Sequence, residues 1–583
     1  MLPVYLTRCN CYTVVHSSTE RKVSTDHAGA RPKVWVGAGA AYVATAVATG
    51  RKLRRQKGER TRLRASASQF TKGANDVTEE PLFCTVLSTH EDWRAAVAEL
   101  TAEASYQLRS RPRKCWDFGI IYVSGHNDVS VTDITMTLDR NLGTSGACVG
   151  AAVNGCGGPG TDHHRRAAGR KAPVIQLIAV QQPLRKEYSS GSVSSSSELP
   201  GAKPFFVGPK ELQEISGLVC QIQGRTRVIG AQEPPMPRAW REYLGVERDE
   251  ARPRGILLFI DPLASKYVVG SVLSALDLAL PNAVKCGAVC ADLLPSRRRV
   301  AVAGYEMRRG ISSADDIPAG VAGLLLPPDV SIHSMVCSGS SRVGPELRVT
   351  SADGQVIKMM QSDNDREAHP AKEMLEAVCR QASPVQQLLI EKGGYLLGLE
   401  APQPLDPDKS KVYDDVWGSS ERAPSYSSLR RQAASCDWLV RSLEPLPGGS
   451  VVIRRENLKR IPPRVGPAWV RCQVHVFDER QGRQELQLML QRYMGARMTL
   501  PTPAGKPFGA MIFTCSSWFA QAEEEVGVAE VSAAFDPPPT VVSVNVCGEV
   551  AHPGIALGGV DQKRTTIQGH TATCCFLSYE PST

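Results

Sequence analysis

The residues with the clearest chemical potential stand near the C-terminus, where a thiol and a carboxylate flank a glycine. Cys547, Gly548 and Glu549 directly follow a buried-strand pattern at 541–546 (VVSVNV). A strand end of this kind suits small-ligand binding, because the glycine lets a ligand approach backbone N–H groups closely. Glu549 could there pair with a ligand amine. The plainer interpretation is a tight turn at Gly548 followed by a solvated Glu549.

A second chemical candidate is Cys515, which ends an apolar strand pattern (GAMIFTC) just before two serines. A cysteine nucleophile needs a lowered pKa and a base within hydrogen-bond distance. The C-terminal histidines are His475, His552 and His570, and no sequence spacing places any of them beside Cys515. A buried structural thiol is therefore the favoured interpretation. A Cys-dependent hydrolase using Cys515 or Cys547 is the alternative.

Patterns that would signal a metal, nucleotide or hydrolase site are weak or missing from the sequence. No HExxH, P-loop, GxSxG or DxDxDG pattern occurs. Cys148 and Cys156, taken with His163 and His164, have poor spacing for a structural zinc site. The GxGxxG match at 155–160 contains a proline, and no helix pattern opens at it. We therefore expect no catalytic residue, no metal and no cofactor.

The elements that must position these residues are short strands mixed with helices. They do not alternate strictly as βαβ units, so we expect an α/β to α+β fold. In this fold class, mixed β-sheets pack with helices, here as two intertwined or adjacent modules. Strand patterns lie at 118–124, 174–180, 256–260, 284–289, 300–303, 319–326, 330–337, 346–360, 450–453, 469–477, 509–515, 541–546 and 571–577, and helical patterns at 90–108, 267–280, 369–380, 484–493 and 520–525.

Length and composition describe a multidomain globular chain whose charge is unevenly placed. The 583 residues are 42% hydrophobic and 22% charged, which is ordinary globular usage. The net charge of +9 lies at the N-terminus, because residues 1–66 hold 13 Lys or Arg against 3 acidic residues. The other 517 residues therefore carry a net charge of −1. A nearly neutral body argues against nucleic acid as its partner.

The N-terminal segment has the composition of a targeting sequence. Residues 1–66 are rich in Arg, Ser and Ala and poor in acids, and RLRASA at 62–67 resembles a plastid processing region. We expect a transit peptide that leads to the plastid (chloroplast) stroma, with the mitochondrion as second choice. The 17 cysteines, without a CxxC pair, agree with a reducing compartment.

An uncharged run at 34–49 lies inside this segment. It has 16 residues, fewer than the roughly 20 that a helix needs to span a bilayer, so we expect no stable membrane span. Whether this run belongs to a multi-part signal or to an anchor stays open.

A series of short motifs runs in order along the body of the chain. They are PNAVKCGA at 281–288, GVAGL at 320–324, GSSRVGP at 339–345, GAMIFTC at 509–515, NVCGEV at 545–550 and IQGHTA at 567–572. This ordered set resembles the FIST domain family over residues 84–578. The chain departs from the family pattern at Phe477 and Ser516, where the family has arginine, and at Gln568, where it has histidine.

The resemblance implies a tandem organisation and a binding function. It divides the chain into a transit peptide at 1–66, a polar lead-in at 67–83, a FIST N-terminal module at 84–360 with a Ser-rich loop at 188–203, and a FIST C-terminal module at 361–583. FIST modules imply non-catalytic sensing of a small ligand, such as an amino acid, in a cleft between the two modules. No F-box segment is readable. The expected ligand-binding residues are Gly344, Asp478, Cys515, Cys547, Gly548, Glu549, Gly569 and Thr571.

Within this expected site, the acidic and glycine positions have different roles. Glu549 or Asp478 would meet a cationic group, and Gly344, Gly548 and Gly569 would allow close backbone approach. The alternative function is a protein-interaction scaffold or adaptor with a vestigial cleft, which the missing arginines and histidine favour. A protein partner is therefore an expectation beside the small ligand.

Overall fold

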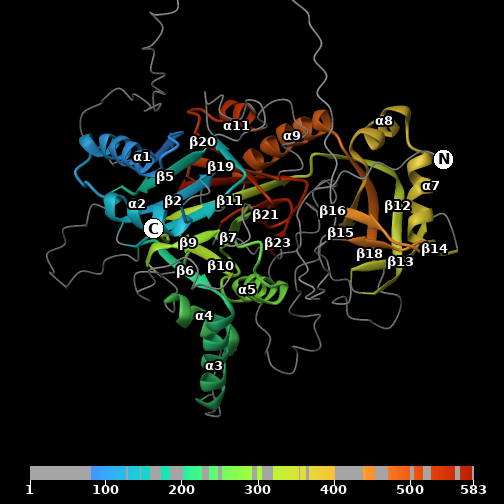
Figure 1. Ribbon diagram of the computed structural model, residues 1–583, viewed down its shortest axis with the longest axis horizontal. Coiled ribbons are helices and arrows are strands. Elements are labelled where there is room, and N and C mark those ends of the chain that lie inside the picture. Colours follow the sequence, from blue (N-terminus) through green and yellow to red (C-terminus); the bar gives the residue numbers. More distant parts are fainter. Residues whose placement is uncertain are drawn as a thin grey trace, which may run out of the picture. The chain divides into compact units, whose positions relative to one another are not determined.

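The computed structural model describes most of the chain from residue 80 to residue 580 (Figure 1). The transit peptide predicted at 1–66, nearly all of the lead-in predicted at 67–83 and the helix predicted at 520–525 lie outside the described residues. The Ser-rich loop predicted at 188–203 lies outside them up to residue 200. The described ranges are 80–126, 129–144, 146–157, 173–183, 201–225, 235–246, 252–291, 299–304, 319–353, 355–362, 367–400, 438–453, 470–498, 500, 505–515, 527–558 and 565–580.

Three stretches of the chain, which we call repeats 1, 2 and 3, contain the same succession of strands and helices. Repeat 1 comprises β1 (Leu82–Ser88), α1 (Trp93–Gln107), β2 (Phe118–Ser124), α2 (Val131–Leu142), β3 (Cys148–Ala152), β4 (Gly155–Gly157) and β5 (Val174–Gln181). Repeat 2 comprises β6 (Lys203–Val207), α3 (Pro209–Arg225), α4 (Pro235–Leu244), β7 (Gly255–Ile260), α5 (Lys266–Ala279), β8 (Val284–Val289), β9 (Val300–Val302) and β10 (Val321–Leu325). Repeat 3 comprises β11 (Val330–Cys337), α9 (Glu479–Met498), β19 (Pro507–Cys515), α11 (Val528–Ala534), β20 (Thr540–Val546), β21 (Gly548–Ala551), β22 (Ile555–Ala556), β23 (Thr566–Ile567) and β24 (Ala572–Tyr579).

Each repeat forms a sheet with the same strand order. The four main strands lie as β1-β5-β2-β3 in repeat 1, β6-β10-β7-β8 in repeat 2 and β11-β24-β19-β20 in repeat 3. The last two strands of each series are parallel, and the other neighbours are antiparallel. A parallel pair needs a crossover connection, which contains α2, α5 and α11 respectively.

One short strand from each repeat leaves its own sheet and extends the sheet of another repeat. β4 pairs with β20, β21 pairs with β8, and β9 pairs with β3, all antiparallel. Repeat 1 thus reaches repeat 3, repeat 3 reaches repeat 2, and repeat 2 reaches repeat 1, which is a cyclic, pseudo-three-fold exchange. Three equivalent backbone hydrogen bonds close this ring: Asn154 N to Asn545 O (2.8 Å), Cys547 N to Val289 O (3.0 Å) and Ala291 N to Ala152 O (2.9 Å).

The three sheets share one apolar core. The central strand of each repeat contributes one aromatic ring to it at a corresponding position, namely Tyr122, Phe259 and Phe513. The centroid of the Tyr122 ring lies 6.0 Å from that of Phe259 and 6.5 Å from that of Phe513, both edge-on. Strands that are buried on both faces are apolar throughout, which explains why patterns such as FGIIYVS at 118–124 contain no charge.

Helices cover the outer face of each sheet. α1 and α2 pack on the sheet of repeat 1, α4 and α5 on that of repeat 2, and α9 and α11 on that of repeat 3. Ser130 and Ser265 begin α2 and α5, because each side chain accepts a hydrogen bond from a backbone N–H in the first turn. The helices and the shared core therefore leave the strand ends as the places where polar side chains can collect.

A separate barrel is inserted in repeat 3, between β11 and α9. Its strands lie in the order β12-β18-β15-β16-β17-β13, and a further β12–β13 pairing closes the ring of six antiparallel strands. The chain enters and leaves at adjacent points, since Asp478 N donates to Gly339 O at 3.1 Å. The elements are β12 (Ser340–Asp353), β13 (Val356–Ser362), β14 (His369–Pro370), α7 (Ala371–Arg380), α8 (Pro384–Gly393), β15 (Leu396–Glu400), β16 (Trp438–Pro445), β17 (Val451–Ile453) and β18 (Val470–Phe477).

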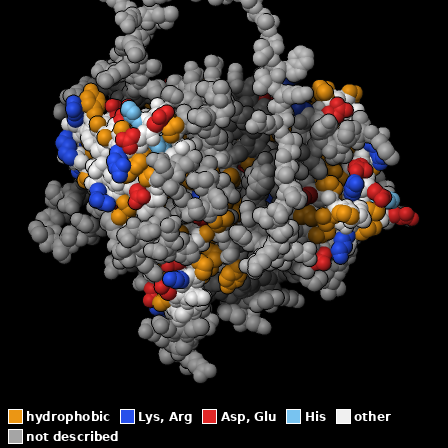
Figure 2. Space-filling model, in the orientation of Figure 1, with side chains coloured by type: hydrophobic (Ala, Val, Ile, Leu, Met, Phe, Trp, Pro, Cys, Tyr) orange, Lys and Arg blue, Asp and Glu red, His pale blue; other side chains and the backbone are white. Residues whose placement is uncertain are grey.

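Side chains of both charges lie together on the face of the molecule that Figure 2 shows. Figure 2 shows Lys and Arg side chains beside Asp and Glu side chains over α1 and over the barrel near α7. Among the helices that the structure describes, none is long and apolar enough to cross a membrane.

The structure confirms the predicted class of mixed sheets packed with helices. The predicted strand at 118–124 has the bounds of β2, and the predicted strand at 284–289 has those of β8. Each of the three sheets and the barrel, apart from the sheet of repeat 1, joins strands from both sides of residue 360. Strands from before and after the predicted module boundary at residue 360 therefore pair with one another.

Candidate functional site

Polar side chains gather where the central strands of the three repeats end. Two positions beyond the core aromatics stand Ser124, Asp261 and Cys515, one from each repeat, and they are 2%, 2% and 7% exposed. The cyclic exchange joins the repeats at this same end, because its ring of backbone hydrogen bonds lies just past β3, β8 and β20. The carboxyl ends of parallel strands are the usual place for a ligand in such sheets.

Glu549 is a charged residue at a position that is apolar in the other two repeats. In β21 it pairs with Ala288, which lies beside Phe259. In β4 and β9, the strands that the other two repeats exchange, the corresponding positions are Cys156 and Val300. Both residues belong to the apolar core. Glu549 is fully buried all the same. Two of three equivalent positions thus satisfy the fold with small apolar side chains, and the fold itself does not call for a carboxylate there.

Residues 565–571, which we call the strap, hold Glu549 in place. Thr571 Oγ1 donates to Glu549 Oε2 at 2.7 Å, and Gln568 N donates to the Glu549 backbone carbonyl at 2.6 Å. Thr571 O in turn accepts from Cys515 N at 3.2 Å. The structure therefore brings together three of the predicted site residues, Cys515, Glu549 and Thr571.

A second group of polar side chains lies at the end of β7 and β8. Arg299 Nη1 stands 3.8 Å from Asp261 Oδ1, and both side chains are 3% exposed. Burial raises the pKa of the Cys290 thiol well above its usual range, and the negative charge of Asp261 and the nearby Cys547 raise it further. The positive charge of Arg299 lowers this pKa, but by less. This thiol is therefore protonated at neutral pH. Asn154 Nδ2 donates to Cys547 Sγ at 3.6 Å, so a fourth predicted residue, Cys547, belongs to this group.

The two groups belong to neighbouring strands of one sheet. Glu549, Ala288 and Phe259 lie side by side on three neighbouring strands, and Asp261 is two residues beyond Phe259. Strand spacing of about 4.8 Å and a rise of about 3.3 Å per residue place the Cα atoms of Glu549 and Asp261 roughly 12 Å apart. Glu549 thus lies two strands away from the pair of Asp261 and Arg299.

Two predicted ligand residues have structural partners elsewhere. Gly344 lies in a β-bulge of β12 with φ +66°, and a Cβ there would come within 2.6 Å of Val378 on α7. Asp478 begins α9, where its Oδ1 accepts from Gln481 N at 3.1 Å. Their contacts are those of a tight backbone approach and a helix cap. The described contacts do not join either residue to Glu549, so ligand binding at these two positions has no support in the geometry.

The two remaining predicted glycines lie beside the site. Gly548 pairs with Val289 in β8, and Gly569 lies in the strap, where a Cβ would come 3.8 Å from Val440 O of the barrel. The first follows Cys547 and precedes Glu549, so its backbone belongs to the site. The second faces β16, so it brings the strap close to the barrel.

The histidines considered as bases for Cys515 have other partners. His475 Nδ1 and Ser340 Oγ lie 2.9 Å apart, and His570 Nε2 and Ser442 Oγ lie 2.7 Å apart. His552 Nε2 accepts from Lys285 N at 3.2 Å. In the part of the chain that the structure describes, no group of three or more His, Cys, Asp or Glu side chains is arranged to hold a metal ion. The hydrolase alternative stays a prediction.

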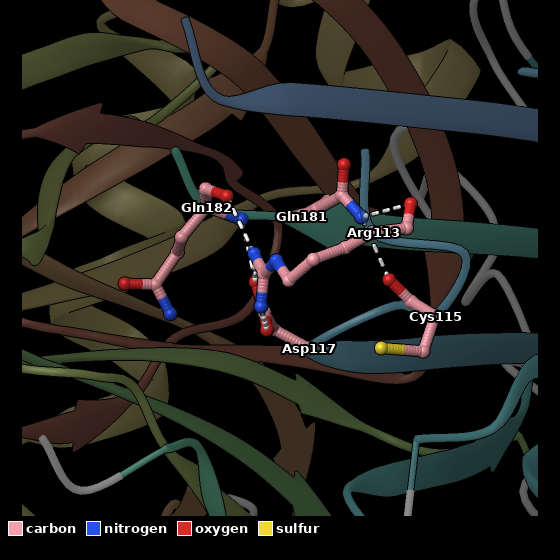
Figure 3. A network of polar contacts seen from close by, with 5 residues as sticks. All are labelled: Arg113, Cys115, Asp117, Gln181 and Gln182. Carbon is pink, nitrogen blue, oxygen red and sulfur yellow. Dashed lines mark hydrogen bonds and ion pairs between the residues drawn. The ribbon is translucent and has the colours of Figure 1, made fainter. Parts of the chain in front are cut away.

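A different polar network lies before β2, at the opposite end of that strand (Figure 3). Arg113 donates two hydrogen bonds to Asp117, at 2.7 and 3.0 Å, and one to Gln182 O at 2.6 Å. Gln181 Nε2 donates to the carbonyl of Cys115 at 2.8 Å. This network ties the segment before β2 to the end of β5, its neighbour in the sheet.

Sequence reasoning missed Ser124, Asp261, Cys290 and Arg299. Asp261 carried a usable signal, because it directly follows the apolar strand ILLFI. Arg299 carried none, since it stands in a run of three arginines that is typical of solvated sequence. Only the pairing of β9 with β3 places it among buried residues.

Comparison with known proteins identifies one domain of this chain. Residues 117–361 match the family model described as FIST N domain. The match spans most of repeat 1, all of repeat 2, and β11 and β12. No curated protein matches the chain.

Proposed function

Because this chain is a FIST domain family protein, and FIST domains are held to sense small ligands, we propose that it binds a small ligand with a cationic group at Glu549. The observation that carries the proposal is the buried carboxylate at a position where the two equivalent strands have Cys156 and Val300. Burying a carboxyl group is costly unless hydrogen bonds or charged partners replace the water that it loses, and the strap supplies one such bond through Thr571 Oγ1. A carboxyl group kept at this cost, at a position where the fold accepts Cys156 and Val300, supports a role in binding.

The guanidinium of Arg299 indicates what else the ligand carries. Arg299 stands beside Asp261 across the site, and a guanidinium binds a carboxylate in a planar, two-pronged fashion. A ligand with an ammonium at Glu549 and a carboxylate at Arg299 is a zwitterion, such as an amino acid. The proposed activity is non-catalytic sensing. The N-terminal segment extends the proposal to the plastid stroma.

Thermal unfolding of the full chain with each of the twenty protein L-amino acids tests this function. At about 100 times its Kd, a bound amino acid should stabilise the protein by roughly 2.7 kcal/mol. Glu549→Val copies the residue type of repeat 2, so the variant should fold and should lose the shift. Asp478→Asn is the matched control, because it changes a predicted site residue that lies in a helix cap.

Two results would overturn the proposal. The first is the absence of a shift with any of the twenty amino acids in the wild type. The second is a shift that survives in Glu549→Val, which would move the ligand away from this carboxylate.

The alternative function is an interaction scaffold, and one surface feature favours it. On α8, Val385 and Leu388 are 69% and 65% exposed, and no residue of this helix is buried. An apolar helix face of this kind suits a protein partner. A partner that is lost with Val385→Ser and retained with Glu549→Val, in a protein that no amino acid stabilises, would favour the scaffold.

A further inference from the structure

The strap at 565–571 contacts both the Glu549 site and the inserted barrel, and we infer that Arg441 of the barrel is a positioning residue for that site. This inference rests on the proposed function for its meaning, and its contacts are independent of any ligand. Arg441 lies on β16, a strand of the barrel, and is 6% exposed. Its role is to hold the strap in the position from which the strap holds Glu549.

On the side of the repeats, the strap is fixed at both ends and in the middle. Thr565 N and Oγ1 donate to the two carboxylate oxygens of Asp277 on α5, at 2.8 and 2.5 Å. Thr566 and Ile567 form β23, which pairs with β21. Gln568 N and Thr571 Oγ1 reach Glu549, as described above. A displacement of the strap therefore moves the groups that fix the Glu549 carboxylate.

On the side of the barrel, two neighbouring residues of β16 hold the strap. Arg441 Nη2 donates to Ile567 O at 2.7 Å, and Ser442 Oγ lies 2.7 Å from His570 Nε2. His570 has φ +57°, the left-handed region, and is the single non-glycine residue with positive φ among those described. This conformation is disfavoured for a residue with a Cβ, so surrounding contacts must maintain it. The contact with Ser442 is one of them.

The hydrogen bond from Arg441 and the hydrogen bond to Glu549 are made by one and the same peptide unit of the strap. Ile567 O accepts from Arg441, and the next amide, Gln568 N, donates to Glu549 O. These two bonds belong to the same peptide unit, whose atoms are coplanar and move together. A change at Arg441 therefore reaches Glu549 through a rigid group.

Because the barrel is an insertion, the contact between Arg441 and the strap can couple the position of the barrel to the Glu549 site. The barrel joins the repeats through two adjacent chain connections at Gly339 and Asp478, and Gly339 has φ +60°. Connections that lie side by side at a glycine suit a hinge. A ligand at the Glu549 site would then shift β16 through the strap. Because coupling between sites is reciprocal, the position of the barrel would change the affinity of the Glu549 site for its ligand.

Hydrogen exchange of the ligand-free full chain, read by mass spectrometry, tests the coupling directly. We expect Arg441→Ala to speed exchange at least about tenfold in the peptide that covers 565–571, and Arg441→Lys to restore part of the protection. Arg471→Ala is the control, because it removes an exposed arginine on the same barrel. Reciprocally, Glu549→Val should change exchange in β16 and leave β13, in the same barrel, unchanged.

Binding of amino acids supplies the second readout. For any amino acid that stabilises the wild type, Arg441→Ala should weaken affinity by about 5- to 50-fold, with Arg471→Ala unchanged. The inference is overturned if exchange in 565–571 is unchanged in Arg441→Ala, or if it rises equally throughout the barrel. If no amino acid binds the wild type, the proposed function fails, and the exchange measurements still decide the coupling.

Discussion

Lys285 offers the most direct test of the electrostatics of this fold. It lies on β8 with its side chain 1% exposed, and Nζ donates to Leu280 O at 2.5 Å. Asp277 Oδ1 is 3.4 Å away. Burial lowers the pKa of Lys285 from its usual 10.5 to about 8, although the nearby Asp277 carboxylate raises it. The folded state therefore favours the neutral, deprotonated form of Lys285 more than the unfolded chain does.

The shift fixes the sign and size of a dependence on pH. Below pH 8 the lysine is protonated in both states, and its protonated form carries the full burial penalty. Between pH 8 and 10.5 the folded protein loses the proton and the unfolded chain keeps it, so the free energy of unfolding rises with pH. At about 1.4 kcal/mol per tenfold change in proton affinity, this group contributes about 3 kcal/mol in all and about 2 kcal/mol between pH 7.5 and 10.

Lys285→Met removes the titrating group and keeps a side chain of similar length. We expect the difference in unfolding free energy between the wild type and this variant to change by about 2 kcal/mol between pH 7.5 and 10, in favour of the wild type at the higher pH. Urea denaturation followed by tryptophan fluorescence measures it at each pH. Lys372→Met, at an exposed lysine on α7, is the control and should follow the wild type at both values. A difference that stays constant over this range would refute the reasoning.

Three further predictions concern groups outside the candidate site. Arg113→Ala should lower the unfolding free energy by about 1 to 2 kcal/mol, because it breaks the paired hydrogen bonds to Asp117; a double-mutant cycle with Asp117→Asn should show that the two changes are not additive. Asp478→Ala should cost about 1 kcal/mol through loss of the α9 cap and leave any amino-acid shift in thermal unfolding unchanged. Burial, and secondly the charge of Arg342, lowers the pKa of His475 to about 4, so the unfolded chain alone binds this proton between pH 6.5 and 4. The wild type should lose up to about 3 kcal/mol as the pH falls through that window, and urea denaturation of His475→Gln should show a smaller loss.

Local sequence patterns were enough for most of the strands. The apolar run at 118–124 predicted β2 with its observed bounds, because a strand with both faces buried needs an apolar side chain at nearly every position. The same reasoning failed for α2, whose sequence VTDITMTLDRNL is rich in threonine and aspartate, residues of modest helix propensity. Its end signals, Ser130 as the N-terminal cap and Gly143 in the left-handed conformation after the last turn, were present in the sequence.

The candidate site was only half predictable. The strand-end positions of Cys515 and Cys547 followed from the sequence, since the first ends an apolar run and the second directly follows one. Glu549 was expected just past that strand end, and it lies instead within a strand of its own, β21. Asp478 is equally polar and equally placed after a strand, yet it caps a helix. Asp478 differs from the two cysteines in the element that follows it in the chain. The residue type at a single position does not reveal that element.

What the sequence determined by itself was most of the strands, some of the helices and the chemistry available at their ends. The tertiary structure decided the cyclic exchange of β4, β9 and β21, because each pairs with a strand far away in the chain, and a local pattern such as the one at 300–303 does not specify its partner. The tertiary structure also decided that Glu549 lies in the core. Burial, and comparison with Cys156 and Val300 at the equivalent positions, are properties of the assembled repeats, and they distinguish a charge held in the core from one at a solvated turn.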